Sequence, residues 1–168
     1  MATTLNYLAG KDFVRKVLAG ERDFSRTKLE EGFDLTGHEG FSEMQMYLKN
    51  TNLNEVRLNL NDSEWRQVTA RELHLPFFNG KNVDLYKANL RGANLYKANF
   101  GGANLYKANF GGADLYKANL GGADLRGVTN LGNTKNLQDA IFDETIVTEV
   151  EKAIIEECLK KRRLFVVK

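Results

Sequence analysis

The stretch from Val83 to Gly127 repeats every five residues without a gap, and no other feature constrains the fold as strongly. Divided into fives, it reads VDLYK, ANLRG, ANLYK, ANFGG, ANLYK, ANFGG, ADLYK, ANLGG, ADLRG. Asn or Asp precedes every central residue, and Ala precedes that in all blocks but the first. The centres are Leu85, Leu90, Leu95, Phe100, Leu105, Phe110, Leu115, Leu120 and Leu125. A repeat this regular has to be interpreted before any other signal.

A period of five excludes the ordinary secondary-structure elements. On an α-helix each step of five residues advances about 140° net, so the centres would make no single apolar face. On a straight strand an odd period would place successive centres on opposite faces. The sequence therefore predicts that the chain turns a corner in every block, with the centre and the Ala pointing inward. Coils stacked about 4.8 Å apart would then pair their backbone groups up and down the stack.

The blocks, written A-(N/D)-(L/F)-x-x, resemble the pentapeptide-repeat family, and the match is specific over residues 83–127. The resemblance implies an all-β solenoid, a right-handed quadrilateral parallel β-helix with four blocks in each coil. Within the family, the chain is similar to members with no assigned biochemical activity, including numerous cyanobacterial ones.

We expect one domain, residues 1–168, with helical caps at both ends. The N-terminal cap spans about 4–20, the β-helix about 22–145, and the C-terminal helix about 149–163. Phe13, Val14, Val17 and Leu18 recur at helical spacing, and Gly10 offers a break between two short helices, with Asp12 as N-cap of the second. This helical region would cover the apolar, unpaired end of the first coil.

The register between Leu58 and Val83 allows two interpretations. Apolar residues at a step of five run offset by two from the later centres: Leu48, Leu53, Leu58, then Val68, Leu73 and Phe78, with Ser63 in the series. Either Lys81-Asn82 is an insertion, which would bury Arg66 and Arg71 at high cost. Or the series holds the inner corner position, with Leu60, Trp65, Ala70 and Leu75 as centres. Both stay open, and we expect a register change somewhere in this segment.

Residues 32–41, GFDLTGHEGF, are predicted to loop out, with His38 as a solvated residue, and His74 is expected at the surface. After Leu125 the repeat decays: residues 130–137 are typical of a loop, and Ala140 and Phe142 form a possible last block.

A second period, of ten residues, governs the outward positions. Tyr-Lys alternates with Gly-Gly or Arg-Gly after each centre, which predicts stacked columns on two opposite sides and two alternating turn classes. The candidate interaction surface is Tyr86, Lys87, Tyr96, Lys97, Tyr106, Lys107, Tyr116 and Lys117. One interpretation is an aromatic ladder that stabilises the coil, with lysines for solubility. The other is a binding surface for an anionic partner, although each side would carry only a weak basic patch.

The C-terminal helix has clear boundary signals. Thr148 and Glu151 form a capping box, and Val150, Ala153, Ile154 and Cys158 then follow at helical spacing. This helix is expected to be a second lid or a dimer contact. The apolar tail Leu164 to Val167 is suited to an edge strand or to an exchange with a neighbouring copy.

Composition adds mainly exclusions. The net charge is +2 and Cys158 is the one cysteine, so no disulfide forms within the chain. Charged residues interrupt any N-terminal apolar run, and we expect neither a signal peptide nor a membrane span, and hence a cytoplasmic location. No catalytic constellation, metal-ligand cluster or phosphate-binding loop is present in the sequence, and we expect no cofactor.

We therefore expect a non-enzymatic structural or protein-interaction module whose partner is a protein, acting as a monomer or as a homodimer through a terminal helix. Some relatives mimic DNA and act on DNA gyrase, which gives one alternative. Residues 83–127 carry six basic and three acidic residues, a net +3, which is the wrong sign for such a mimic. Weak nucleic-acid binding by the Tyr-Lys surfaces is a further alternative, and we do not expect it.

Overall fold

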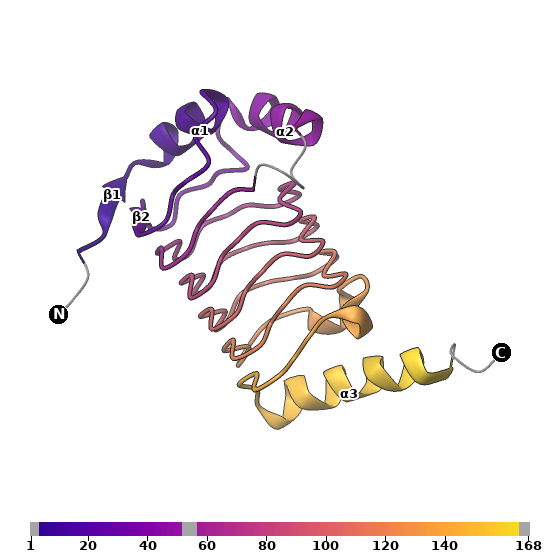
Figure 1. Ribbon diagram of the computed structural model, residues 1–168. Helices are drawn as coiled ribbons and strands as arrows, with labels where there is room; N and C mark the ends of the chain where they lie inside the picture. Colours follow the sequence, from indigo (N-terminus) through magenta and orange to yellow (C-terminus); the bar gives the residue numbers. More distant parts are fainter. Residues whose placement is uncertain (1–3, 52–56, 165–168) are drawn as a thin grey trace.

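The computed structural model describes residues 4–51 and 57–164, with side chains to Lys161. Its elements are β1 (Asn6–Leu8), α1 (Gly10–Leu18), β2 (Thr27–Leu29), α2 (Phe41–Asn50), the 3₁₀ turns η1 (Leu131–Asn133) and η2 (Leu137–Asp139), and α3 (Glu149–Leu164). From Asp23 to Ile146 the chain winds into a stack of coils, which α2 interrupts in the first coil. Helices α1 and α2 lie at one end of this stack and α3 lies at the other (Figure 1).

Each coil has four sides, because parallel bridges recur every five residues and join positions twenty residues apart, as in Asn59 with Asn79 and Glu64 with Asp84. We number the faces by their central outward residues. Face 1 contains Glu64, Asp84, Asn104 and Asp124; face 2 contains Thr69, Asn89, Asn109 and Thr129; face 3 contains His74, Asn94, Asp114 and Lys135; face 4 contains Asn59, Asn79, Asn99 and Asn119. A corner interrupts each side after a single bridged residue, so the coils contain bridges rather than long strands.

The interior is filled by the central residues and the residues two positions before them. All nine predicted centres are buried, as are the alanines that accompany them. The same register runs on through Leu58–Leu60, Ser63–Trp65, Val68–Ala70, Leu73–Leu75 and Phe78–Gly80, and the first and last residue of each of these ranges is buried. The expected register change is therefore wrong: no insertion exists at Lys81-Asn82, and Arg66 and Arg71 point outward.

An exchange of side-chain sizes explains why the sequence suggested a shift. At Phe78–Gly80 the large residue stands in the corner position and glycine stands at the centre. A Cβ atom on Gly80 would lie 2.3 Å from the Phe78 ring, so the phenylalanine fills the space that a central Leu occupies elsewhere. The ring of Phe78 also packs edge-on against Phe100 in the next coil, with centroids 4.9 Å apart.

The invariant Asn or Asp has two hydrogen-bonding roles. Within a block its Oδ1 accepts the backbone N–H two residues later, as Asn104 does from Tyr106 at 3.1 Å. Between coils an Asn Nδ2 donates to the residue above it, as Asn104 does to Asp84 at 3.0 Å. The first bond shapes each corner as an Asx turn, which explains why both Asn and Asp are accepted at this position.

All the corners of the regular coils belong to one class, so the predicted alternation of turn types is wrong. Lys87, Lys97, Lys107 and Lys117 have φ of 53–60°, and Gly92, Gly102, Gly112 and Gly122 have φ of 67–72°. Each turn closes with a bond from the next Ala N–H to the centre carbonyl, 2.9 Å from Ala88 to Leu85. The lysines therefore adopt the left-handed backbone conformation that usually favours glycine.

The N-terminal end departs from the predicted helical cap. Residues Asn6–Leu8 form β1, which pairs in parallel with β2, and α1 begins at Gly10 with Ala9 rather than Asp12 as N-cap. Phe13 of α1 packs against the rings of Phe24 and Trp65, at 4.8 and 4.7 Å between centroids. Helix α1 thus covers the apolar opening of the first coil.

Helix α2 differs from the sequence-based expectation, because Leu48 also fits the step of five; Leu53 of that series lies outside the described residues. The helix takes the place of face 3 in the first coil. Its Gln45 side chain bonds the exposed backbone there: Nε2 donates to the Glu72 carbonyl at 2.5 Å, and Oε1 accepts the His74 N–H at 2.8 Å. A side-chain amide therefore satisfies the backbone edge as a strand would.

The last coil keeps the four sides but gains residues at its corners. Thr129 bridges twenty residues back, Lys135 twenty-one, and Ile141 and Ile146 twenty-two. The turns η1 and η2 take up the extra residues, so residues 130–137 continue the coil and are not a loop.

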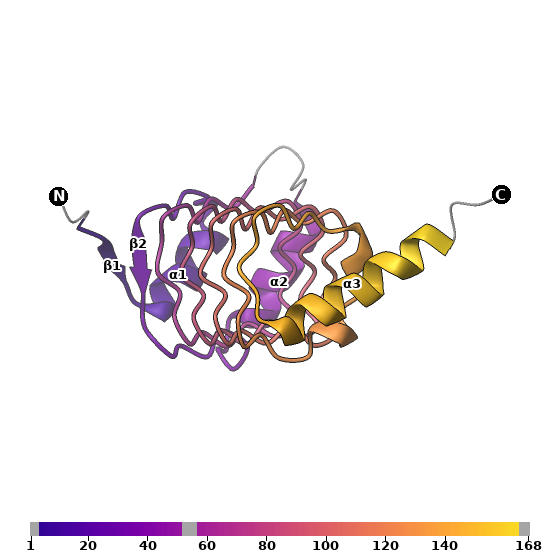
Figure 2. The same ribbon diagram turned by 90° about the horizontal axis from the view of Figure 1, so that it is seen from below.

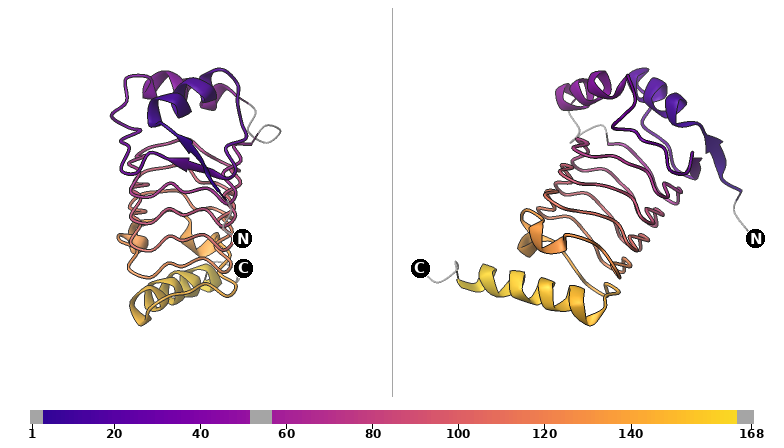
Figure 3. Two further views of the ribbon diagram at one scale, coloured as in Figure 1. Left: turned by 90° about the vertical axis from the view of Figure 1, so that its left-hand side faces the viewer. Right: turned by 180° about the vertical axis from the view of Figure 1, so that it is seen from behind.

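Helix α3 then packs on η1 and η2. Its covered side consists of Glu151 and Ile155, with Ile154, Cys158 and Leu159 partly covered, whereas Val150 and Ala153 are exposed. The expected apolar face was therefore wrong for those two residues. The far half of α3 extends beyond the outline of the coils (Figures 2 and 3). Residues 165–167 of the predicted apolar tail lie outside the described part of the chain.

Candidate functional site

The tyrosines predicted as ladders do stack, and they do so at two diagonally opposite corners of the coil. At the corner between faces 1 and 2, the rings of Tyr86 and Tyr106 are 6.0 Å apart and inclined by 11°. At the corner between faces 3 and 4, Tyr96 and Tyr116 are 5.4 Å apart and inclined by 15°. The ten-residue period thus becomes two straight columns that run along the stack.

Cations of the same chain cover much of these rings. Each column lysine places its Nζ 4.9–5.2 Å from the ring centroid of the tyrosine before it. The guanidinium of Arg66 lies 4.8 Å from the Tyr86 ring, and that of Arg126 lies 5.8 Å from Tyr106. Such contacts contribute about 0.5–1 kcal/mol each at exposed sites. These rings therefore stabilise the column, while the lysines themselves remain exposed.

A shallow concavity of about 420 Å³ lies beside the Tyr86 column on face 1. Arg126 donates two bonds to Asp124, at 2.9 and 2.8 Å, and these hydrogen bonds lower the pKa of that carboxyl group. Arg66 lies 3.6 Å from a carboxylate oxygen of Asp84. The charges in this concavity are therefore largely paired with one another.

The four faces differ in charge, which the sequence analysis did not predict because it summed the charges of residues 83–127 without assigning them to faces. Each face consists of its central row and the corner residues just before and just after it. Over the coils from Arg57 to Thr129, face 2 carries Arg71, Lys87, Arg91 and Lys107, and face 4 carries Arg57, Lys81, Lys97 and Lys117. Neither of these two faces contains an Asp or a Glu, whereas faces 1 and 3 hold the acidic residues of the repeat.

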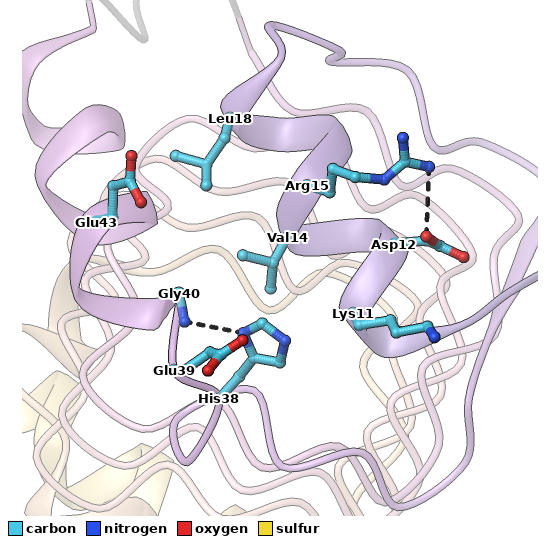
Figure 4. Close-up of a pocket in the computed structure, with 9 residues that line it drawn as sticks. All are labelled: Lys11, Asp12, Val14, Arg15, Leu18, His38, Glu39, Gly40 and Glu43. Atoms are coloured by element: carbon cyan, nitrogen blue, oxygen red, sulfur yellow. Dashed lines mark hydrogen bonds and ion pairs between the residues drawn. The ribbon is translucent and has the colours of Figure 1, made fainter.

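A groove of about 610 Å³ separates α1 and α2 at the N-terminal end (Figure 4). Val14 and Leu18 of α1 give it apolar walls, and charged side chains such as Lys11 and Glu43 line it as well. Nδ1 of His38 accepts the Gly40 N–H at 3.0 Å, so this histidine is engaged in the turn before α2. The groove was not predicted from the sequence, because α2, which was not predicted either, forms one of its sides.

The part of the chain that the structure describes contains neither a metal-binding cluster nor a membrane-spanning helix. Among residues 4–51 and 57–164, no three His, Cys, Asp or Glu side chains are placed to hold a metal ion. No helix within those ranges is long and apolar enough to cross a membrane.

The family model for pentapeptide repeats matches residues 66–101 and 93–129. This part of the chain belongs to the pentapeptide-repeat family. Family members form right-handed β-helices, in agreement with the four-sided coil. The pentapeptide repeats continue in the structure beyond the matched residues, from Leu58 on one side to the corner-expanded coil on the other.

Thirty chains of solved structure are similar to this one, and no curated protein matches it. A pentapeptide repeat protein from the Arabidopsis thaliana thylakoid lumen is 24% identical over 57% of this chain and 66% of its own, with a TM-score of 0.41. Rfr23 from the cyanobacterium Cyanothece 51142 is 30% identical over 55% and 61%, with a TM-score of 0.28. The chain thus spans less than two thirds of the length of these two proteins. QnrB1, a plasmid-mediated fluoroquinolone resistance protein, is 11% identical over 82% of each chain, with a TM-score of 0.29.

Proposed function

We propose that this chain is a non-enzymatic module that presents a rigid repeat surface to a partner protein. One observation carries the proposal. The column lysines Lys87, Lys97, Lys107 and Lys117 are exposed along straight rows, and no carboxylate of the described residues lies within ion-pair distance of them. A solenoid holds such rows in fixed geometry at no further ordering cost, which favours binding by a preorganised surface.

The alternatives have less support. A DNA mimic that acts on gyrase needs a dense negative surface, whereas between Arg57 and Thr129 faces 2 and 4 carry four cations each and no acidic residue. In the first coil the central row of each of these faces adds a carboxylate, Asp34 on face 2 and Asp23 on face 4. Weak nucleic-acid binding would use open aromatic faces for base stacking, and here neighbouring rings and cations occupy them. A cytoplasmic location, and a monomer or a homodimer formed through α3, remain parts of this proposal.

The test is affinity capture with chemical crosslinking from native lysate. The test variant replaces Lys87, Lys97, Lys107 and Lys117 by Gln and leaves the tyrosines, which stabilise the columns, in place. The control replaces the exposed helix lysines Lys49, Lys152, Lys160 and Lys161 by Gln, so both variants lose the same charge. We expect a protein that the intact chain and the control capture and the test variant loses. Equal capture by all three would remove the columns from the proposed surface.

A further inference from the structure

Resting on this proposed function, we infer that face 2 is the binding face and that its partner is an acidic peptide segment of another protein. Face 2 is bordered by Lys87 and Lys107 at the corner before its central row, and by Arg71 and Arg91 at the corner after it. All four side chains belong to exposed residues. Together they flank the uncharged residues Thr69, Asn89 and Asn109 on both sides, which is a layout for a linear anionic ligand. Asp34 precedes Thr69 in this row, so the ligand would lie over the coils that follow the first one.

These cations are not neutralised by the chain itself. Elsewhere on the coils Arg126 is bonded to Asp124, Arg66 lies beside Asp84, and Lys28 lies 3.0 Å from Glu64. Within the described residues, none of the four cations of face 2 forms an ion pair, and Arg71 and Arg91 have no aromatic ring beneath them either. Their charge is available to a ligand.

The central row of face 2 adds hydrogen-bond donors. On face 4, the Nδ2 groups of Asn99 and Asn119 donate to the asparagine above, at 3.0 and 3.2 Å. On face 2, Asn89 and Asn109 use Oδ1 to accept a corner N–H, and neither donates through Nδ2 to any described residue. Face 2 therefore presents free N–H donors between two columns of cations, which distinguishes it from face 4.

This chemistry selects carboxylates on an extended chain. A guanidinium group pairs with a carboxylate through two parallel bonds, and an amide N–H₂ bonds the same acceptor. The three residues of each side span about 10 Å, which accommodates a single extended peptide. Binding to duplex DNA depends on the number of phosphates that cations neutralise, and four cations on this face could contact few of them, so nucleic acid is the less favoured ligand.

The probe is a fluorescein-labelled peptide of about ten glutamates, followed by anisotropy at about 20 mM and about 200 mM salt. The face 2 variant carries Arg71→Gln, Lys87→Gln, Arg91→Gln and Lys107→Gln. The matched control, the face 4 variant, carries Arg57→Gln, Lys81→Gln, Lys97→Gln and Lys117→Gln and has the same net charge. We expect the face 2 variant to lose at least about tenfold in affinity and the face 4 variant less than about threefold, with binding weaker at high salt.

A second variant, Asn89→Asp with Asn109→Asp, separates binding from folding. Asp occupies the same position at Asp84, Asp114 and Asp124 and forms the same corner bond, so the variant should fold normally by circular dichroism. It should nevertheless no longer bind the peptide, because it places negative charge in the row that would contact the carboxylates of the peptide.

Three results would overturn the assignment of face 2: equal losses in the two charge variants, no binding by the intact chain, or tighter binding of an oligothymidylate of equal charge. The lysate experiment keeps this failure apart from that of the module itself. A captured protein that survives the face 2 variant but not the column variant removes the face and keeps the module. If the intact chain neither binds the peptide nor captures a protein, both the assignment of face 2 and the proposed module function are wrong.

Discussion

At the scale of the residue, backbone conformation at the corners decides which side chains the repeat accepts. The second corner residue has positive φ whether it is Gly or Lys, so lysine occurs there in spite of its backbone cost. A lysine at this place keeps an exposed charge and covers the preceding tyrosine ring. Glycine supplies the same turn without a side chain. The alternation of Lys and Gly therefore reflects surface chemistry and not two kinds of turn.

This conclusion gives a matched pair of substitutions. Gly112 has φ of 72°, and a Cβ there would meet no atom closer than 4.0 Å, so Gly112→Ala adds backbone strain without a clash. We expect it to lower the free energy of unfolding by about 1–2 kcal/mol. Lys107 already has φ of 60°, and Lys107→Ala should cost about 0.5–1 kcal/mol, the contact with the Tyr106 ring. Urea denaturation compares the two, and equal costs would contradict a shared turn class.

At the scale of the element, the sequence predicted the coils far better than the ends. Each block states its own inward and outward positions, so Leu85 and its equivalents could be placed from the period alone. The elements at the two ends occur once each, so they can be predicted only from a weak local pattern and not from a repeat. Phe41, Met44 and Leu48 have helical spacing, but Leu48 also fits a step of five. The segment was therefore assigned to the repeat and not to a helix. Strand β1 was hidden because three residues carry almost no periodic signal.

Besides its packing on η1 and η2, the C-terminal helix is hydrogen-bonded to the coils through one carboxylate. Glu151 accepts the Thr148 N–H at 2.8 Å, which is the reciprocal bond of the predicted capping box. It also accepts the Gly127 N–H at 3.0 Å. The equivalent N–H of Lys107 donates to the Arg126 carbonyl in the next coil, and Gly127 has no such coil beneath it. Glu151 thus caps the helix and the end of the stack at once.

Removing this charge should loosen α3 in a pH-dependent way. Burial raises the pKa of Glu151, but the hydrogen bonds from Thr148 and Gly127 outweigh it and hold the pKa below its ordinary value. Because the folded-state pKa is lowered, the stabilisation is fully present above the unfolded value of about 4.3 and is lost as pH falls through the folded value. We expect Glu151→Gln to cost about 1–2 kcal/mol at pH 7 and little at strongly acidic pH.

The control is Glu149→Gln, which removes a charge from the same helical turn at a side chain that is 92% exposed. Thermal melts of both variants across pH 3–7, followed by circular dichroism, provide the measurement. Equal destabilisation by the two substitutions would assign the effect to the helix dipole rather than to the bond with Gly127.

At the scale of the whole molecule, the coil behaves as a one-dimensional stack in which each turn contacts only its neighbours. Its register is twenty residues in the regular coils, and the extra corner residues of the last coil leave the four faces in line. The number of sides and the charge of each face could not be obtained from the period alone. Both depend on which blocks come to lie above one another, and hence on coil length. For this reason the proposed interaction face is the part of the molecule that is hardest to predict from the sequence.

Two deletions test the register directly. Removing residues 103–122 takes out one whole coil and joins Gly102 to Ala123, so every inward pair, Asn row and face continues across the junction. We expect this variant to fold and to melt cooperatively, at a lower temperature because one set of stacking contacts is missing. Removing residues 103–123 takes one residue more and joins Gly102 to Asp124, so Asp124 would stand at an inward position and Leu125 at an outward one. A corner can take up extra residues, as in the last coil, but it cannot supply a missing one. That variant should lose the circular dichroism signal of the folded coil and its cooperative melt. If the deletion of residues 103–123 proved as stable as the deletion of residues 103–122, stacking in a fixed register would not be what holds the molecule together.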